Sequence, residues 1–263
     1  DEGWGIPTLA PLAGEVDLSW HLIHTLVEQE FDVVTCQEML VDHACTLPLK
    51  LFWPEGDCPV TVVPVCINTV QFPLPSAKRC YALGKAVGQA ISSWNSDKKV
   101  AVIASGGLSH QLDGERAGFI NKAFDWQFSE SLTTNPEWAT QFSIHELVEK
   151  TGTQGVELLM WLAMRGALSA NVRKVHQSYY LPSMTGIAVA IYENEAQQQP
   201  LPGPVARHRA RMAQELAGAE KLAGTYPYTL ERSVKGYRLN HYLHELIKPE
   251  FRAAFRADEE ATY

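Results

Sequence analysis

A strand–helix–strand pattern between residues 60 and 105 constrains the fold of this chain more than any other feature. Residues 60–70, VTVVPVCINTV, are rich in β-branched side chains and predict a strand, with Pro64 favouring an edge position or a bulge. Residues 75–94 repeat apolar side chains at steps of three and four, which predicts an amphipathic helix. A second, fully apolar strand is predicted at 100–105, VAVIAS. This order is typical of a βαβ unit with parallel pairing, so we expect an α/β fold with a central mixed sheet flanked by helices.

The rest of the chain adds helices and a change of composition near residue 200. Apolar spacing predicts helices at 16–29, 117–132, 143–150, 155–168 and 205–220, strands at 33–36 and within 176–193, and a loop containing a proline at 41–53. The polar, proline-rich stretch at 197–204 is typical of a boundary. We therefore expect a main domain over 1–200, a connecting helix over 201–225 and a helical segment over 226–263.

Composition and charge argue against several classes of protein. The 263 residues carry a net charge of −8 without a basic stripe, so no nucleic-acid partner is expected. No apolar run reaches about 18 residues, so no membrane span is expected, and the start at Asp1 lacks the basic and apolar regions of a signal peptide. Five cysteines without a CxxC pair favour reduced thiols in a cytoplasmic protein over structural zinc or a disulfide framework.

His110 is the first candidate functional residue. It follows the predicted strand 100–105 and the pair Gly106-Gly107. In open α/β sheets, ligands bind at the carboxyl ends of strands, and glycines there let the backbone turn sharply or approach a ligand. A histidine in this place can transfer a proton near neutral pH. The alternative is a loop histidine that hydrogen-bonds to a carbonyl group.

Glu157 is the second candidate. It is the only acidic residue in the apolar stretch 155–168, and it shares a helical face with Met160, Trp161 and Met164. A carboxylate that points into such a face must be paired, protonated or bound to a metal, because an isolated buried charge is very costly. The alternative is an acid in the first helical turn near solvent, where the helix dipole favours it.

Other histidine patterns carry weaker signals. His43 lies in a loop after a predicted strand and is a third candidate for the site. The pairs His21/His24 and His241/His244 are each one helical turn apart and could hold a metal, although a polar stripe on a helix explains them as well. The glycines of SGGLSH form neither GxGxxG nor a P-loop, and no GxSxG motif surrounds the serine before His110.

Three stretches together resemble one enzyme family. They are SGGLSHQLDGERAGFINKAFDWQF (105–128), GVELLMWLAMRGALSANV (155–172) and YYLPSMTGIAVAIYEN (179–194). The chain resembles the protocatechuate 4,5-dioxygenase family of class III extradiol ring-cleaving dioxygenases. The tail ERSVKGYRLNHYLHELIKPEFRAAFRADEEA resembles the start of that family's small helical subunit, so the segment 226–263 is expected to form part of a lid.

The resemblance implies an iron site. These enzymes hold non-haem Fe(II) with two histidines and one glutamate, leaving positions open for the catecholic oxygens and O2. Glu157 matches the family's metal carboxylate, His110 its acid–base histidine, His43 a second active-site histidine, and Thr185 a contact to the substrate carboxylate. The two iron histidines of the family are expected upstream of Asp1, so we expect the chain as given to bind Fe(II) weakly and to be inactive alone.

The resemblance also implies a substrate. A catalytic and a small subunit fused in one chain are typical of members that open the ring of gallate with O2, giving a product of the 4-oxalomesaconate type. Protocatechuate is the alternative substrate, and a metal-free binding module on the same scaffold is the alternative class of function. The expected partners are a small aromatic substrate, O2 and, because the tail is expected to cover an active site, a second copy in a homodimer.

Overall fold

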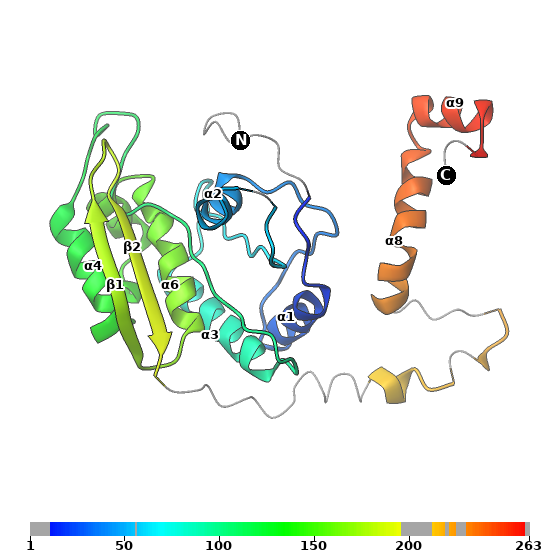
Figure 1. Cartoon of the computed structure of the whole chain (residues 1–263), viewed down its shortest axis with the longest axis horizontal. Coiled ribbons are helices and arrows are strands. Elements are labelled where there is room, and N and C mark those ends of the chain that lie inside the picture. Colours follow the sequence, from blue (N-terminus) through cyan, green and yellow to red (C-terminus); the bar gives the residue numbers. More distant parts are fainter. Residues whose placement is uncertain (1–10, 56, 196–211, 219–220, 225–229, 261–263) are drawn as a thin grey trace. The chain divides into compact units, whose positions relative to one another are not determined.

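A computed structural model of the chain describes residues 11–55, 57–195, 212–218, 221–224 and 230–260. The chain divides into two compact units, Asp1–Ala206 and Arg207–Tyr263. Figure 1 shows the chain, with both strands and the larger helices labelled.

The first unit combines helices with one pair of strands, so the expected α/β fold class is confirmed. The helices predicted around residues 16–29, 75–94, 143–150 and 155–168 are all present, and the one predicted at 117–132 begins later, at Lys122. The elements in chain order are α1 (Val16–Glu28), α2 (His43–Phe52), α3 (Ala77–Ser93), α4 (Lys122–Thr134), η2 (Trp138–Gln141), α5 (Ile144–Thr151), η3 (Gly155–Glu157), α6 (Leu158–Ala167), β1 (Val172–Tyr180) and β2 (Ile187–Asn194).

Helices α3 and α6 pack with their backbones in contact, and α1 packs against α3. A Cβ atom at Gly84 of α3 would lie 2.0 Å from the carbonyl oxygen of Ala163, and one at Gly166 of α6 would lie 2.3 Å from that of Tyr81. Neither position has room for a side chain, so the glycines set the separation of the two helices. Around this contact lies the main core, whose fully buried members include Phe128, Leu132, Leu147, Leu159 and Leu162.

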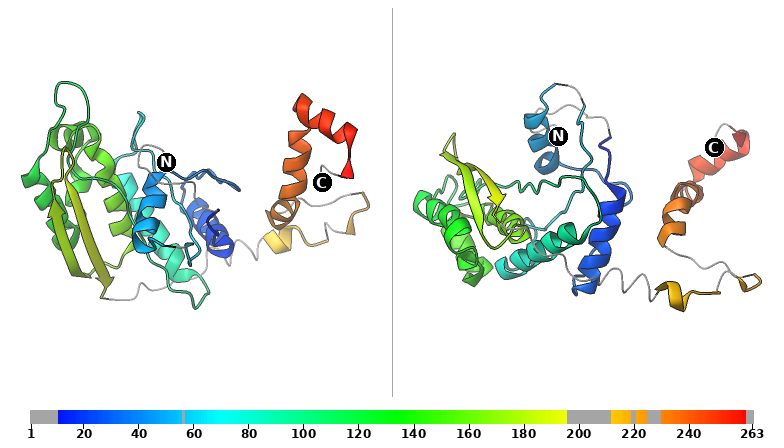
Figure 2. Two further views of the ribbon diagram at one scale, coloured as in Figure 1. Left: turned by 45° about the horizontal axis from the view of Figure 1, so that its top comes forward. Right: turned by 60° about the horizontal axis from the view of Figure 1, so that its bottom comes forward.

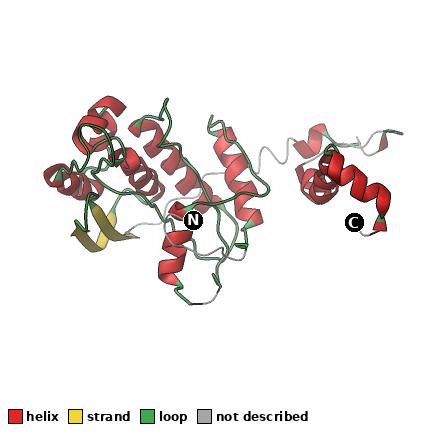
Figure 3. Ribbon diagram, turned by 90° about the horizontal axis from the view of Figure 1, so that it is seen from above, coloured by secondary structure: helices red, strands yellow, loops and turns green. Residues whose placement is uncertain are grey.

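The strands form one antiparallel ribbon, with Tyr179 opposite Ala188 and a register shift between Lys174 and His176. Figures 2 and 3 show this ribbon beside the helices of the same unit. Alternation along β2 is regular: Ala188, Ala190 and Tyr192 pack on the core, and the residues between them are exposed. The prediction of one or two strands within 176–193 is confirmed.

The prediction that residues 60–70 and 100–105 form a parallel pair of strands is wrong. In the described residues these segments lack a strand ladder, and the only pairing in them is an isolated bridge between Val62 and Gly14. The prediction of a strand at 33–36 is also wrong, because these residues form no strand. A run of apolar, β-branched residues favours an extended backbone, but a strand exists only where a second segment satisfies its N–H and C=O groups.

The loop predicted at 41–53 is also wrong, because these residues form α2. The Asp42 carboxylate caps the helix by accepting a hydrogen bond from the Ala44 amide at 3.0 Å. Pro48 lies inside the helix and cannot donate to the Ala44 carbonyl four residues earlier. That carbonyl instead accepts the Ser105 hydroxyl at 2.7 Å, so a tertiary contact replaces the missing helical hydrogen bond.

The second unit contains α8 (Leu230–Glu245) and α9 (Pro249–Ala257), which confirms the helical pattern predicted for the tail. The Arg252 guanidinium donates to the carbonyls of Leu246 and Ile247 between the two helices. The boundary predicted at 197–204 and part of the helix predicted at 205–220 lie outside the described residues. Among the helices that the structure describes, none combines the length and apolarity that crossing a membrane requires.

Candidate active site

Three of the four candidate residues meet at the turn that contains Gly106 and Gly107. The Gly107 amide donates to Oε2 of Glu157 at 2.6 Å, although the two residues are 50 positions apart. Three residues further on, His110 forms an antiparallel bridge with Thr185, which lies in the connection between β1 and β2. The turn therefore presents a carboxylate, an imidazole and a threonine from three separate segments.

The His110 side chain is 6% exposed and has a defined orientation. Its Nδ1 atom lies 2.8 Å from the carbonyl oxygen of Leu108. Because a carbonyl only accepts hydrogen bonds, the neutral imidazole carries its proton on Nδ1 and leaves Nε2 as a proton acceptor. The hydrogen bond to a carbonyl that would explain a structural loop histidine is thus present, and it leaves Nε2 without a hydrogen-bond partner among the described residues.

Glu157 ends η3 and directly precedes α6, with its side chain half-buried. The Gly107 amide engages Oε2, and among the described residues no hydrogen bond engages Oε1. The Trp161 indole donates to the Gly106 carbonyl at 2.9 Å, which fixes the backbone beside the carboxylate. Glu157 is therefore turned towards the glycine turn and held there through one oxygen, and Oε1 remains able to bind a ligand.

Gly107 is required for this arrangement because the site has no space for a side chain. A Cβ atom there would lie 2.9 Å from Cε1 of His110 and 3.0 Å from Cγ2 of Thr185. We expect Gly107→Ala to displace both side chains and to lower kcat by roughly 100-fold, as about 1 Å of misplacement can do. Steady-state kinetics check this, with Gly14→Ala as control, since its added Cβ comes no closer than 4.0 Å to another atom. Normal turnover in Gly107→Ala would contradict the proposed placement of the two side chains.

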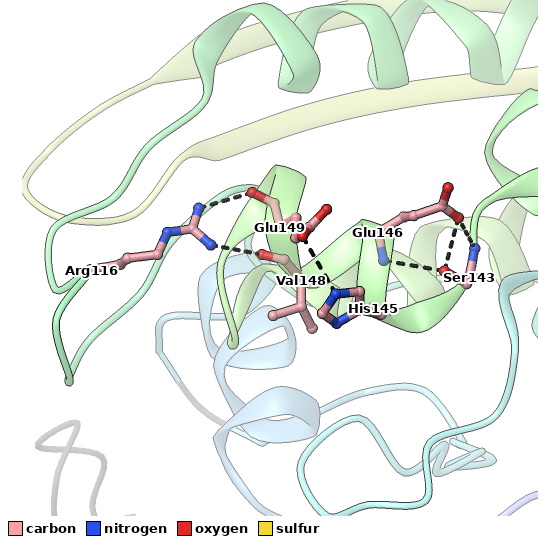
Figure 4. Close-up of polar contacts among 6 residues, drawn as sticks. All are labelled: Arg116, Ser143, His145, Glu146, Val148 and Glu149. Atoms are coloured by element: carbon pink, nitrogen blue, oxygen red, sulfur yellow. Dashed lines mark hydrogen bonds and ion pairs between the residues drawn. The ribbon is translucent and has the colours of Figure 1, made fainter.

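The C-terminal end of α5 supports the loop that follows Gly106 and Gly107. The His110 amide donates to the Thr151 carbonyl at 2.7 Å. Further along the same loop, the Arg116 guanidinium donates to the carbonyls of Val148 and Glu149, as Figure 4 shows. The Val148 carbonyl also accepts the amide of Gly152, the C-cap residue of α5. A cationic donor suits carbonyls at the C-terminal end of a helix, where the helix dipole is negative.

The other end of α5 is capped as firmly, and Figure 4 shows both ends. The Ser143 hydroxyl accepts from the Glu146 amide, and the Glu146 carboxylate accepts from the Ser143 amide, forming a capping box. The Glu146 carboxylate accepts hydrogen bonds from the amide and from the hydroxyl of Ser143, and these two bonds lower its pKa. A short helix fixed at both ends is a rigid support for the loop that carries His110.

The fourth candidate, His43, is the first residue of α2 and is half-buried. The contact between the Ala44 carbonyl and the Ser105 hydroxyl ties the first turn of α2 to the residue that precedes Gly106. The structure thus connects the His43 segment to the turn, and the role of the imidazole itself stays a prediction.

Sequence reasoning missed a buried polar group beneath the turn. Asp125 of α4 is 1% exposed, and its carboxylate accepts the amide and hydroxyl of Ser109 and the hydroxyl of Tyr179. Burial, followed by the hydrogen bond to Asp125, raises the pKa of the Tyr179 hydroxyl, so this group stays protonated and donates. The available signal was an acid on a helical face between the core residues Phe124 and Phe128.

The paired histidines outside the turn have other surroundings. Nε2 of His21 lies 2.9 Å from the Ala90 carbonyl and from the Ser93 hydroxyl, which fits a structural role between α1 and α3. The His241 ring stacks on Tyr237 at a centroid distance of 5.7 Å. Across the described part of the chain, no three His, Cys, Asp or Glu side chains gather closely enough to hold a metal ion.

Comparison with known proteins identifies the family. The profile described as the catalytic LigB subunit of aromatic ring-opening dioxygenase matches residues 1–190. The chain belongs to this family. Its reactants are therefore an aromatic compound and O2, and the chemistry is that of a ring-opening dioxygenase.

Two relatives show how far the similarity to this family extends. A gallate dioxygenase of Pseudomonas putida is 47% identical over 265 residues, an alignment that covers 100% of this chain and 77% of the relative. A 2,3-dihydroxyphenylpropionate/2,3-dihydroxicinnamic acid 1,2-dioxygenase of Xanthobacter autotrophicus is 28% identical over 68% of this chain and 71% of its own length. The first alignment spans both units of the chain, including the helices α8 and α9.

Proposed function

We propose that the protein opens the aromatic ring of gallate with O2 in an extradiol, Fe(II)-dependent reaction that gives a product of the 4-oxalomesaconate type. The substrate assignment is supported by the similarity of the whole chain to the gallate dioxygenase of Pseudomonas putida. The chemistry is supported above all by the geometry of His110. Its Nδ1 atom donates to the Leu108 carbonyl, so Nε2 can accept a proton, and the Glu157 carboxylate is held at the same glycine turn by the Gly107 amide.

His110 is proposed as the acid–base group. With its proton on Nδ1, the neutral imidazole can take the proton of a phenolic hydroxyl at Nε2 and return it later in the reaction. Its low exposure keeps bulk water from competing for this position. Thr185, held beside it by the bridge, is proposed to contact the substrate carboxylate, and His43 is proposed to hydrogen-bond the substrate.

Glu157 is proposed as the carboxylate ligand of the iron. The described residues do not complete an iron site, because no three of their His, Cys, Asp or Glu side chains lie close enough together to hold a metal ion. Two histidine ligands are therefore proposed outside the described residues. Bound Fe(II) would supply a site where the aromatic substrate and O2 react as neighbours.

Relative rates on gallate and protocatechuate test the substrate assignment. Protocatechuate lacks one ring hydroxyl of gallate. A site that hydrogen-bonds that hydroxyl rejects protocatechuate, because the polar groups of the site are then left unpaired. We expect the full-length, iron-loaded protein to favour gallate in kcat/KM by at least about 100-fold, a conservative figure for such a site. A preference for protocatechuate would overturn the substrate assignment and leave ring opening intact.

A further inference from the structure

Asp125 is a buried carboxylate that the proposed reaction does not use. It lies on α4, is 1% exposed and sits between Phe124 and Phe128, which belong to the main core. Its three hydrogen-bond donors are a backbone amide and two hydroxyls, all of them neutral. A carboxylate in such surroundings is costly to bury, so its contacts point to a task beyond packing.

Asp125 accepts two hydrogen bonds from Ser109, one of them from the amide of the Leu108–Ser109 peptide group. Its Oδ1 accepts the Ser109 amide at 2.9 Å, and its Oδ2 accepts the Ser109 hydroxyl at 2.6 Å. The Ser109 hydroxyl oxygen accepts the Asn121 amide at 2.8 Å, so its own proton is directed to the carboxylate. Two adjacent donors on one carboxylate fix both the position and the rotation of Ser109.

The same peptide unit holds the imidazole of His110. The amide of Ser109 and the carbonyl of Leu108 belong to one planar peptide group. The amide side donates to Asp125, and the carbonyl side accepts Nδ1 of His110 at 2.8 Å. A carboxylate on the amide polarises the peptide and makes its carbonyl a stronger acceptor. Asp125 is thereby connected to His110 through a single rigid group.

The carboxylate also brings the Thr185 segment into place. A Cβ atom at Gly186 would lie 2.6 Å from Oδ2 of Asp125, so only glycine allows this approach. The Gly186 amide donates to the Ser109 carbonyl at 2.9 Å, and the Leu108 amide donates to the Gly186 carbonyl at 2.8 Å. These two hydrogen bonds lie next to the bridge between His110 and Thr185.

We propose that Asp125 is a positioning residue that acts through the Leu108–Ser109 peptide group to hold His110 in its Nδ1-protonated form, with Nε2 facing the substrate. This role rests on the proposed function of His110 in ring opening. In many metal sites a carboxylate orients a histidine by accepting a hydrogen bond from its ring. Here a peptide group lies between the carboxylate and the histidine.

The histidine tautomer in metal-free protein, read from 15N chemical shifts after labelling of histidine, tests the proposal without turnover. The His110 signal is assigned by its loss in His110→Phe. We expect the Nδ1-protonated form in the wild type and a shift towards the Nε2-protonated form in Asp125→Asn. Ser131→Ala, which removes another buried hydroxyl of α4, should leave the tautomer unchanged. The same tautomer in folded Asp125→Asn and wild type would overturn the proposal.

Kinetics supply the second readout. We expect Asp125→Asn to lower kcat by about 10- to 100-fold, as is typical when the partner that orients a functional side chain is lost, with KM changed by less than about threefold. Ser109→Ala keeps the amide contact and should lower kcat by about three- to tenfold, so it serves if Asp125→Asn does not fold. Unchanged kcat in either folded variant would contradict the role. Failure of ring opening in the wild type would overturn the proposed function and leave the tautomer result standing.

Discussion

Replacement of His110 by phenylalanine is expected to abolish turnover while the protein keeps its fold and its iron. Phenylalanine keeps a planar ring at this position but carries no proton acceptor in place of Nε2, and general acid–base groups contribute about 100- to 10,000-fold to rates. We therefore expect kcat on gallate to fall by at least about 100-fold. Oxygen consumption and product formation measure turnover, and metal analysis after anaerobic loading measures iron.

Two variants separate this effect from a loss of stability. His110→Phe leaves the Leu108 carbonyl without its donor, which costs about 1–3 kcal/mol when the acceptor is buried. His110→Asn can still donate to that carbonyl and is expected to be equally inactive. His176→Phe changes an exposed histidine of β1 and should retain activity. Turnover near the wild-type value in His110→Phe would remove His110 from the mechanism.

Replacement of Glu157 by alanine is expected to abolish iron binding in the full-length protein. The Glu157 carboxylate accepts the Gly107 amide through Oε2, and Oε1 is the atom that remains able to bind a ligand. We expect the affinity for Fe(II) to fall by more than the roughly 10- to 100-fold typical of a residue that only supports a ligand. Iron content after anaerobic loading and gel filtration is the measurement.

The matched control for Glu157→Ala is Glu149→Ala, which removes an exposed acid that pairs with His145 on α5. Its iron content is expected to equal that of the wild type. Full iron occupancy in Glu157→Ala would refute the role of this carboxylate. A wild type that takes up no iron but binds gallate would favour the metal-free binding module.

The candidate site was visible in the sequence because two residues contradict their local surroundings. Glu157 is an acid in an otherwise apolar stretch, and His110 follows a glycine pair at the end of an apolar run. In the structure the Gly107 amide donates to the Glu157 carboxylate, which brings the acid to the glycine pair that precedes His110. Asp125 has the same signature on α4, but its polar sequence neighbours Gln127 and Ser129 make the contrast weaker.

The parts of the fold that escaped prediction depend on contacts distant in the sequence. The run at 100–105 favours an extended backbone, but nothing in it specifies a partner strand. Pro48 reads as a helix breaker, and α2 accommodates it because Ser105, far along the chain, bonds the carbonyl that the proline leaves without a donor. Helices whose apolar spacing and caps are local, such as α3 and α5, were predicted closely.

A crystal structure of the full-length, iron-loaded protein with gallate under anaerobic conditions would show where the iron and the substrate bind. We expect metal density on Oε1 of Glu157 and a phenolic oxygen of gallate within about 2.6–3.2 Å of Nε2 of His110. Metal bound elsewhere, or gallate bound away from the turn of Gly106 and Gly107, would contradict this expectation.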